Sequence, residues 1–271
     1  MKLIFLDIDG TLTVAGENTP PKSALDAIRR TQAKGNKVFL CTGRNLDMLK
    51  PLLVYDFDGV VGSSGGYITV GDTVLYDNPM SDDTRDKALD ILHRNGVFCT
   101  IEAKDGSWGD DNISDFIKSG PEGNSEIERW RKALAENLGI RKMSEYNGSP
   151  IYKIVVMCND ISQLDEAKSA LSDEFNFVIQ EVKEHNCING ELVNKAFDKG
   201  RGIIKVAEYY NLRLEDTIGF GDSMNDLEMI ETVGTSVCMD NGANALKEIA
   251  DVICPRVEDD GLAKAFAELN L

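Results

Sequence analysis

Residues 1–11 read MKLIFLDIDGT, and this stretch decides the fold class. The run from Leu3 to Leu6 is short, continuous and apolar, which is typical of a strand buried on both faces of a parallel sheet. Asp7 and Asp9 follow, and alternation along a strand predicts that both side chains start on one face. Open α/β sheets bind ligands at the carboxyl ends of their strands, where two close carboxylates need a cation or a shared proton. An isolated Asp-x-Asp-Gly is equally typical of a solvated strand end, so other residues must decide.

The pattern around this stretch predicts an α/β core made from both ends of the chain. Helical spacing over residues 22–34 and an apolar strand over 37–41 complete a βαβ unit. The same alternation of strands and helices returns after Cys187. We therefore predict a Rossmann-like parallel sheet core built from residues 1–79 and 186–271.

Residues 80–185 have a different character. Helical patterns, including one over 125–138, are mixed with strands rich in β-branched residues, without a strict βαβ rhythm. This mixture predicts a separate, inserted α+β module. Hinges are expected on either side of the insertion, near residues 78–79 and 185–190.

The chain is acidic. Its 271 residues include 29 Lys and Arg against 46 Asp and Glu, which gives a formal net charge of -17. Such a surface repels nucleic acid and anionic membranes, so neither is expected as a partner. The apolar start is too short for a signal peptide and no stretch approaches a membrane span, so we expect a cytoplasmic protein. A site for an anionic substrate would then need its own cation and local basic side chains.

Six cysteines are spread along the chain without a Cys-x-x-Cys pair. This distribution disfavours a disulfide framework or a zinc site and predicts reduced thiols in the core. His93 and His185 are the only histidines, and neither belongs to a motif. A surface or hinge role is therefore expected for both.

Two further segments could bind a phosphoryl group. Thr42 follows the second expected strand, and its hydroxyl and the backbone N–H groups of Gly43 and Arg44 could donate hydrogen bonds to phosphoryl oxygens. Lys199 precedes an expected helix and offers a point charge that suits a phosphoryl group or an aspartate. Lys195 competes with it, and spacing alone barely separates the two. Threonines at strand ends and lysines at helix starts are also common without a function.

An acidic segment follows a strand expected near the end of the chain. Residues 219–226 read GFGDSMND, so Asp222, Asn225 and Asp226 offer three side chains with oxygen atoms after a glycine turn. Hard oxygen donors of this kind suit Mg²⁺. The same acids could simply cap and begin a helix. The joint pattern is stronger than any single motif, because all these clusters fall at expected strand ends or adjacent helix starts.

With these motifs the chain resembles the haloacid dehalogenase superfamily of aspartate-nucleophile phosphatases, specifically its Cof-like branch. The matching elements are Asp7 to Leu12, Thr42 to Arg44, Lys199-Gly200, Gly221 to Asp226, Met239 to Asn241, Lys247 with Ala250-Asp251, and Asp260-Gly261. The similarity spans the whole core and is weak within residues 80–185. The resemblance implies that this insertion is an α+β cap domain of the larger, sheet-based type 2 class.

The resemblance also implies catalytic roles. Asp7 would be the nucleophile that forms an aspartyl-phosphate, and Asp9 would protonate the leaving oxygen and then activate water. Thr42 would hold the phosphoryl group, while Lys199 would offset its charge and orient Asp7. A free Asp has a pKa of about 3.9, so we expect Asp7 to be ionised at neutral pH without special tuning.

Mg²⁺ is the cofactor that the resemblance implies. Asp7 and Asp222 would bind it through their carboxylates, and Asp9 would bind it through its backbone carbonyl. Asn225 would contact the phosphate, and Asp226 would support the metal waters or the catalytic lysine.

The expected function is a Mg²⁺-dependent phosphatase that hydrolyses a small phosphate monoester such as a sugar phosphate. A phosphomutase is the close alternative, because some capped relatives return the phosphoryl group to the substrate. A catalytically silent sugar-phosphate-binding regulator is a third hypothesis, from a different class. A haloacid dehalogenase is disfavoured, since Asp9 and the acidic cluster suit phosphoryl chemistry. Neither the particular substrate nor the oligomeric state follows from the sequence.

Overall fold

The computed structural model describes residues 1–112, 139–182 and 187–271. These residues form two compact units. The first unit comprises Met1–Arg44, Met48–Asn78 and Phe197–Leu271, and the second comprises Asn45–Asp47 and Pro79–Ala196. The helix expected over 125–138 and the boundary expected between residues 185 and 186 lie outside the described residues.

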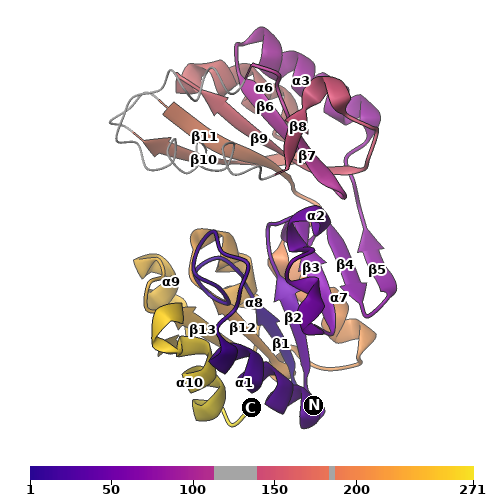
Figure 1. Ribbon diagram of the computed structural model, residues 1–271. Helices are drawn as coiled ribbons and strands as arrows, with labels where there is room; N and C mark the ends of the chain where they lie inside the picture. Colours follow the sequence, from indigo (N-terminus) through magenta and orange to yellow (C-terminus); the bar gives the residue numbers. More distant parts are fainter. Residues whose placement is uncertain (113–138, 183–186) are drawn as a thin grey trace. The chain divides into compact units, whose positions relative to one another are not determined.

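An eight-stranded sheet forms the centre of the first unit (Figure 1). Its strands follow the order β14-β13-β12-β1-β2-β3-β4-β5. They are β1 (Leu3–Leu6), β2 (Lys37–Cys41), β3 (Gly59–Gly62), β4 (Tyr67–Val70), β5 (Thr73–Asp77), β12 (Thr217–Gly221), β13 (Thr235–Met239) and β14 (Val252–Cys254). Neighbouring strands from β14 to β3 are parallel, and β4 and β5 add antiparallel pairs at one edge. The predicted Rossmann-like parallel core is confirmed.

Helices cover both faces of this sheet. They are α1 (Lys22–Ala33), α7 (Lys199–Tyr209), α8 (Leu227–Thr232), α9 (Asn244–Ile249) and α10 (Gly261–Glu268). The short helix α2 (Leu46–Leu49) spans the boundary between the two units. Ile203 of α7 and Met229 of α8 share a buried cluster with Phe5 and Phe39 of the sheet. The ring of Phe220 lies 5.3 Å from that of Phe266 in α10, and α10 packs against α1. The central strands are therefore buried on both sides, as their continuous apolar sequence requires.

The strand order reverses between β1 and β12, and this reversal positions the site. β1 pairs in parallel with β2 on one side and with β12 on the other, so that Leu6 lies opposite both Leu40 and Phe220. The carboxyl ends of the three strands therefore meet at one edge of the sheet. Open α/β sheets bind ligands at such a reversal, because the following loops diverge and leave room there.

The second unit is an α+β structure around a six-stranded sheet of order β10-β11-β9-β6-β7-β8. Its elements are α3 (Asp82–Arg94), β6 (Phe98–Ala103), β7 (Gly106–Gly109), β8 (Ile140–Lys142), β9 (Ile151–Cys158), α6 (Asp165–Leu171), β10 (Phe175–Val182) and β11 (Cys187–Asn194). Ile91 of α3 and Leu171 of α6 share one buried cluster with Ile101 and Ile154 of the sheet. The two helices therefore supply the apolar cover for one face of the sheet.

The last segment of the first unit begins at Phe197 rather than at the expected residue 186. The reason is β11, which pairs along β10 and β9 and so belongs to the sheet of the second unit. None of the helices in the described ranges combines the length and the apolar composition of a membrane span.

Candidate active site

Asp7 stands immediately after β1, at the reversal of strand order. Its backbone N–H donates to the carbonyl of Phe220 in the neighbouring strand, at 2.9 Å. This bond extends the pairing of β1 with β12 by one residue and fixes the start of the loop. The Asp7 side chain is only 7% exposed, so its carboxylate lies in the interior of the first unit.

Lys199 meets this carboxylate from the start of α7. Asp198 caps the helix by accepting a hydrogen bond from the Arg201 backbone at 2.7 Å. The Lys199 side chain is 1% exposed, and its Nζ lies 2.7 Å from Oδ1 of Asp7. The backbone of Asp198 also packs tightly on Gly65. A Cβ added to Gly65 would lie 2.2 Å from the carbonyl oxygen of Asp198. The loop after β3 therefore helps to position the lysine.

The structure separates the two candidate lysines. Lys199 Nζ also bonds Oδ1 of Asp226 at 2.5 Å and Oδ1 of Asn225 at 3.1 Å. Lys195 instead donates to the backbone carbonyl of Ser172 at 2.5 Å, within the second unit. Among the described residues, only Lys199 has its ammonium in the carboxylate cluster.

The loop after β12 turns its acids inward through its own backbone. Oδ2 of Asp226 accepts hydrogen bonds from the N–H groups of Asp222, at 3.0 Å, and Ser223, at 3.1 Å. A Cβ at Gly221 would lie 2.6 Å from the Asp226 side chain, so only glycine fits where the loop folds back. Asp226 is fully buried. It stands at the start of a helix, as expected, and it also accepts a hydrogen bond from Lys199.

Two residues near Asp222 had no site role in the sequence prediction. Thr11 Oγ1 donates to Oδ1 of Asp222 at 3.3 Å, and Asn241 Nδ2 donates to Oδ2 at 3.1 Å and to the Gly10 carbonyl at 3.0 Å. Gly10 has φ +84°, and a Cβ there would lie 2.4 Å from Oδ2 of Asp222. Both Thr11 and Asn241 belong to segments that match the haloacid dehalogenase pattern. That match is the feature of the sequence that could have pointed to their role in holding Asp222.

Asp9 does not join the carboxylate cluster. β1 ends at Leu6, so strand alternation does not carry through to Asp9. Arg44 holds the Asp9 carboxylate with two bonds, Nε to Oδ2 at 2.9 Å and Nη2 to Oδ1 at 2.7 Å, and the Gly16 backbone adds a third at 2.9 Å. The sequence predicts that Arg44 contacts the phosphate. In the structure its side chain instead binds Asp9, the expected acid and base of the reaction.

Thr42 and Gly43 lie at the carboxyl end of β2. Thr42 is 2% exposed, and its Oγ1 accepts a hydrogen bond from the Arg44 backbone at 3.1 Å. Its carbonyl accepts from the backbone of Ser64 at 2.9 Å, which joins the loops after β2 and β3. Gly43 is half-buried between them.

The electrostatics of the cluster call for a cation. One carboxylate oxygen each from Asp7, Asp222 and Asp226 lie within 4.8 Å of one another, and Lys199 supplies a single positive charge. Burial, followed by repulsion from Asp226, raises the pKa of Asp7 well above its usual value. The expectation that Asp7 needs no tuning is therefore wrong. Burial and the charge of Asp226 also raise the pKa of Asp222 to about 6.

Lys199 shows the opposite balance. Burial alone would lower the pKa of its ammonium, but the charges of Asp226 and Asp7 outweigh burial and raise it. The lysine is therefore a permanent cation. When all three carboxylates are ionised, they exceed this charge by two, and one divalent ion would balance the difference and favour the ionised forms. An all-oxygen donor set is what Mg²⁺ prefers, so the residues fit this metal.

Comparison with known proteins agrees with this geometry. Residues 4–266 match the family of haloacid dehalogenase-like hydrolases. The chain is 30% identical to YkrA of Bacillus subtilis over 274 residues, which covers 100% of this chain and 98% of YkrA. It is 27% identical over 285 residues to YwtE of the same species, named as a 5-amino-6-(5-phospho-D-ribitylamino)uracil phosphatase, with coverage of 99% and 98%. The solved structure of the phosphatase BT1666 from Bacteroides thetaiotaomicron is similar with a TM-score of 0.80 and 18% identity, over 100% and 95% of the two chains.

The chain therefore belongs to the haloacid dehalogenase superfamily, in its Cof-like branch. YwtE and other similar proteins are named as phosphatases, and the chain is accordingly a phosphoric monoester hydrolase.

Proposed function

We propose that this protein is a Mg²⁺-dependent phosphatase that hydrolyses a small phosphate monoester through an aspartyl-phosphate at Asp7. The observation that carries this proposal is the buried 2.7 Å pair of Lys199 Nζ and Asp7 Oδ1 beside two further carboxylates. A nucleophile needs an activated and correctly placed oxygen. Lys199 binds one oxygen of Asp7 and thereby orients the other. The same ammonium offsets the charge of the phosphoryl group as it arrives.

The reaction divides into two displacements. In the first, Oδ2 of Asp7 forms a bond to phosphorus while the bond to the leaving oxygen breaks, and Asp9 gives that oxygen a proton. In the second, water forms a bond to phosphorus, passes its proton to Asp9 and releases Asp7 and inorganic phosphate. Two easier steps replace one difficult displacement. Because Arg44 holds Asp9 in the structure, the first step requires the Asp9 carboxyl to leave Arg44.

Asp7, Asp222 and the backbone carbonyl of Asp9 would hold Mg²⁺, with Asp226 at its waters. The ion, when bound, neutralises negative charge on the transferring oxygens. Thr11 and Asn241 hold Asp222 by hydrogen bonds to its two oxygens, and they thereby set the direction in which its carboxylate can bind. Thr42, Gly43 and Asn225 are proposed to contact the phosphoryl group.

The substrate is proposed to be a small phosphorylated metabolite, with a sugar phosphate as the leading class. YwtE, similar along nearly its whole length, is named for a substrate whose phosphate sits on a ribityl chain, which supports a polyhydroxylated leaving group. The second unit is proposed to be the cap, on the basis of its insertion between β5 and α7. The net charge of -17 argues against nucleic acid as a substrate. Five cysteines of the described residues are buried and take part in no disulfide, which supports work in a reducing cytoplasm.

The test is phosphate release from a panel of phosphorylated sugars, sugar alcohols, nucleotides and pyridoxal phosphate, with Mg²⁺ and with EDTA. We expect steady release from a monophosphate, dependent on Mg²⁺ and absent in Asp7→Asn. Substantial turnover by Asp7→Asn would overturn the covalent mechanism. A requirement for a bisphosphate activator would favour the phosphomutase. Binding of a phosphorylated sugar by the wild-type protein without any turnover would favour the regulator.

A further inference from the structure

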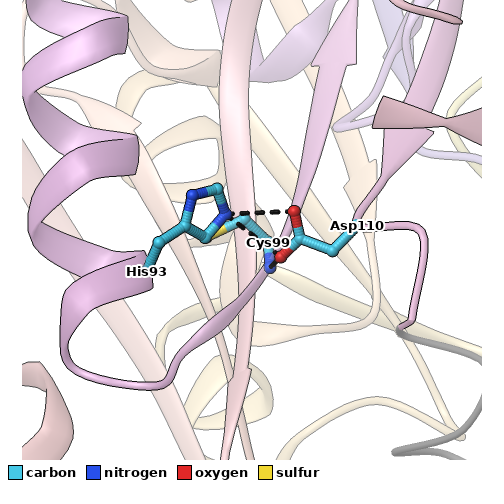
Figure 2. Close-up of side chains that lie close together, drawn as sticks. All are labelled: His93, Cys99 and Asp110. Atoms are coloured by element: carbon cyan, nitrogen blue, oxygen red, sulfur yellow. Dashed lines mark hydrogen bonds and ion pairs between the residues drawn. The ribbon is translucent and has the colours of Figure 1, made fainter. Parts of the chain in front are cut away.

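A second group of possible metal ligands belongs to the second unit and takes no part in the proposed reaction. His93 lies in the last turn of α3, Cys99 in β6, and Asp110 directly after β7. Figure 2 shows the three side chains converging from these separate elements. One ligand atom from each, a ring nitrogen, a sulfur and a carboxylate oxygen, lie within 4.8 Å of one another.

Backbone pairing explains why the three side chains meet. β6 and β7 are antiparallel, with Thr100 opposite Gly109, so the next pair outward is Cys99 with Asp110. The Asp110 N–H donates to the Cys99 carbonyl at 2.9 Å, and the Cys99 N–H donates to Oδ2 of Asp110 at 2.7 Å. Nε2 of His93 lies 3.0 Å from Oδ1 and 3.1 Å from Oδ2 of the same carboxylate. The Cys99 backbone thus orients the carboxylate so that both of its oxygens lie near the imidazole.

The donor set differs in kind from the carboxylates of the first unit. Nitrogen, sulfur and oxygen together suit a borderline-soft ion such as Zn²⁺, whereas Mg²⁺ prefers oxygen alone. Zn²⁺ bonds to nitrogen and oxygen at about 2.0–2.2 Å and to sulfur at about 2.3 Å, so its tetrahedral donors lie roughly 3–4 Å apart. The spread of these three atoms therefore needs only a small contraction.

Access and sulfur chemistry also fit a metal. The His93 side chain is 42% exposed and that of Asp110 13%, so one side of the group is open to solvent. Cys99 is buried at the inner side, and within the part of the chain that the structure describes its thiol makes a long contact of 3.9 Å to the Val97 carbonyl. An ion could enter past the imidazole, bind the sulfur behind it and keep a water as the fourth ligand.

We propose that His93, Cys99 and Asp110 bind one Zn²⁺ ion and thereby tie α3 to the β6–β7 hairpin. On binding, the Cys99 thiol releases its proton to solvent, and Nε2 of neutral His93 exchanges its contact with Asp110 for a bond to the ion. The lack of a Cys-x-x-Cys pair argues against zinc sites built from several cysteines. It does not bear on this site, which uses a single cysteine. The proposal is independent of the phosphatase mechanism, because no residue is shared.

Co²⁺ is the probe for this site, since cobalt bound to a thiolate absorbs light by charge transfer from sulfur whereas cobalt bound to oxygen donors does not. The full chain is titrated with Co²⁺ in excess Mg²⁺, which occupies oxygen-only sites. We expect one equivalent to produce the sulfur band, and one equivalent of Zn²⁺ to remove it by displacement. Absence of the band in the wild-type chain would overturn the proposal.

Three variants localise the signal. Cys99→Ser and His93→Gln should lose it, and the second keeps a donor toward Asp110 at a half-exposed position, so it should fold normally. Cys158→Ser is the matched control, because Cys158 is another buried thiol of the second unit and donates to the Asp160 carbonyl at 3.4 Å. It should keep the band. A band that persists in Cys99→Ser, or tight Zn²⁺ binding unchanged in His93→Gln, would mean that the His93–Asp110 contact only ties the helix to the sheet.

Discussion

Nζ of Lys199 lies 2.7 Å from Oδ1 of Asp7, although 192 positions separate the two residues in the chain. Both side chains are almost fully buried, so this pair is shielded little by solvent. The same ammonium bonds Asp226, which makes Lys199 the one cation among the buried acids of the described site. Both catalysis and the stability of the first unit should therefore depend on it.

Replacing Lys199 by Met tests this dependence. The variant leaves Asp7 and Asp226 buried without their cation, so we expect the free energy of unfolding to fall by about 3–5 kcal/mol. Turnover should fall roughly 100- to 1,000-fold, since a preorganised charge at the phosphoryl group is lost. Urea unfolding and steady-state kinetics measure the two effects. Lys195→Met is the matched control and should keep wild-type turnover; equal kinetics for both variants would contradict the assignment.

Asn241 should control metal affinity through Asp222. Its amide donates to Oδ2 of Asp222 and to the Gly10 carbonyl, so Asn241→Ala frees the carboxylate to turn. We expect the Mg²⁺ concentration for half-maximal rate to rise about 10- to 100-fold, with turnover recovered at saturating Mg²⁺. Initial rates across a Mg²⁺ series measure this change. Asp240→Asn alters the adjacent residue, which faces Lys247, and should leave the curve in place. An unchanged curve for Asn241→Ala would exclude the positioning role.

Alanine substitutions at two glycines with nearly equal backbone angles distinguish the effect of backbone strain from that of a steric clash. Gly10 has φ +84° and Gly16 has φ +82°, but a new Cβ would meet Asp222 at Gly10 and nothing within 4 Å at Gly16. Gly16→Ala should cost about 1–2 kcal/mol of stability from the left-handed backbone alone and keep its activity. Gly10→Ala should lose activity as well, because Asp222 must move. Similar activity in the two variants would show that Asp222 tolerates displacement.

The pH dependence of stability should include a contribution from Asp251. The backbone N–H of Ser236, followed by its hydroxyl, donates to Oδ2 of Asp251 and lowers the pKa of that carboxyl below its ordinary 3.8. A depressed pKa in the folded state stabilises the protein fully above the unfolded value, and this contribution disappears as pH falls through the folded value. Asp251→Asn should therefore be less stable than the wild type at neutral pH.

The difference between Asp251→Asn and the wild type should shrink below pH 3.8, where the wild-type carboxyl becomes protonated. Urea midpoints of both proteins over a descending pH series measure it. A difference that stays constant into the acid range would show that the Ser236 bonds do not depend on the charge of Asp251.

Much of the first unit could be predicted from local pattern. The sequence predicts a strand at Leu3–Leu6 because a continuous apolar run needs a position that is covered on both faces, and the structure has a strand there. The sequence places residues 187–194 in the core, whereas β11 belongs to the second unit because it pairs with β10 and β9. Pairing partners are distant in sequence, and a strand carries no local mark of them.

The sequence alone determined which residues could do chemistry: the acids after β1 and β12, the threonine after β2 and a lysine at the start of a helix. Tertiary structure decided which lysine reaches Asp7, that Asp9 is held by Arg44, and that Thr11 and Asn241 hold Asp222. The physical reason is that residue type and spacing set the kind of bond a side chain can form. Burial and partners arise only when strands far apart in the chain lie side by side.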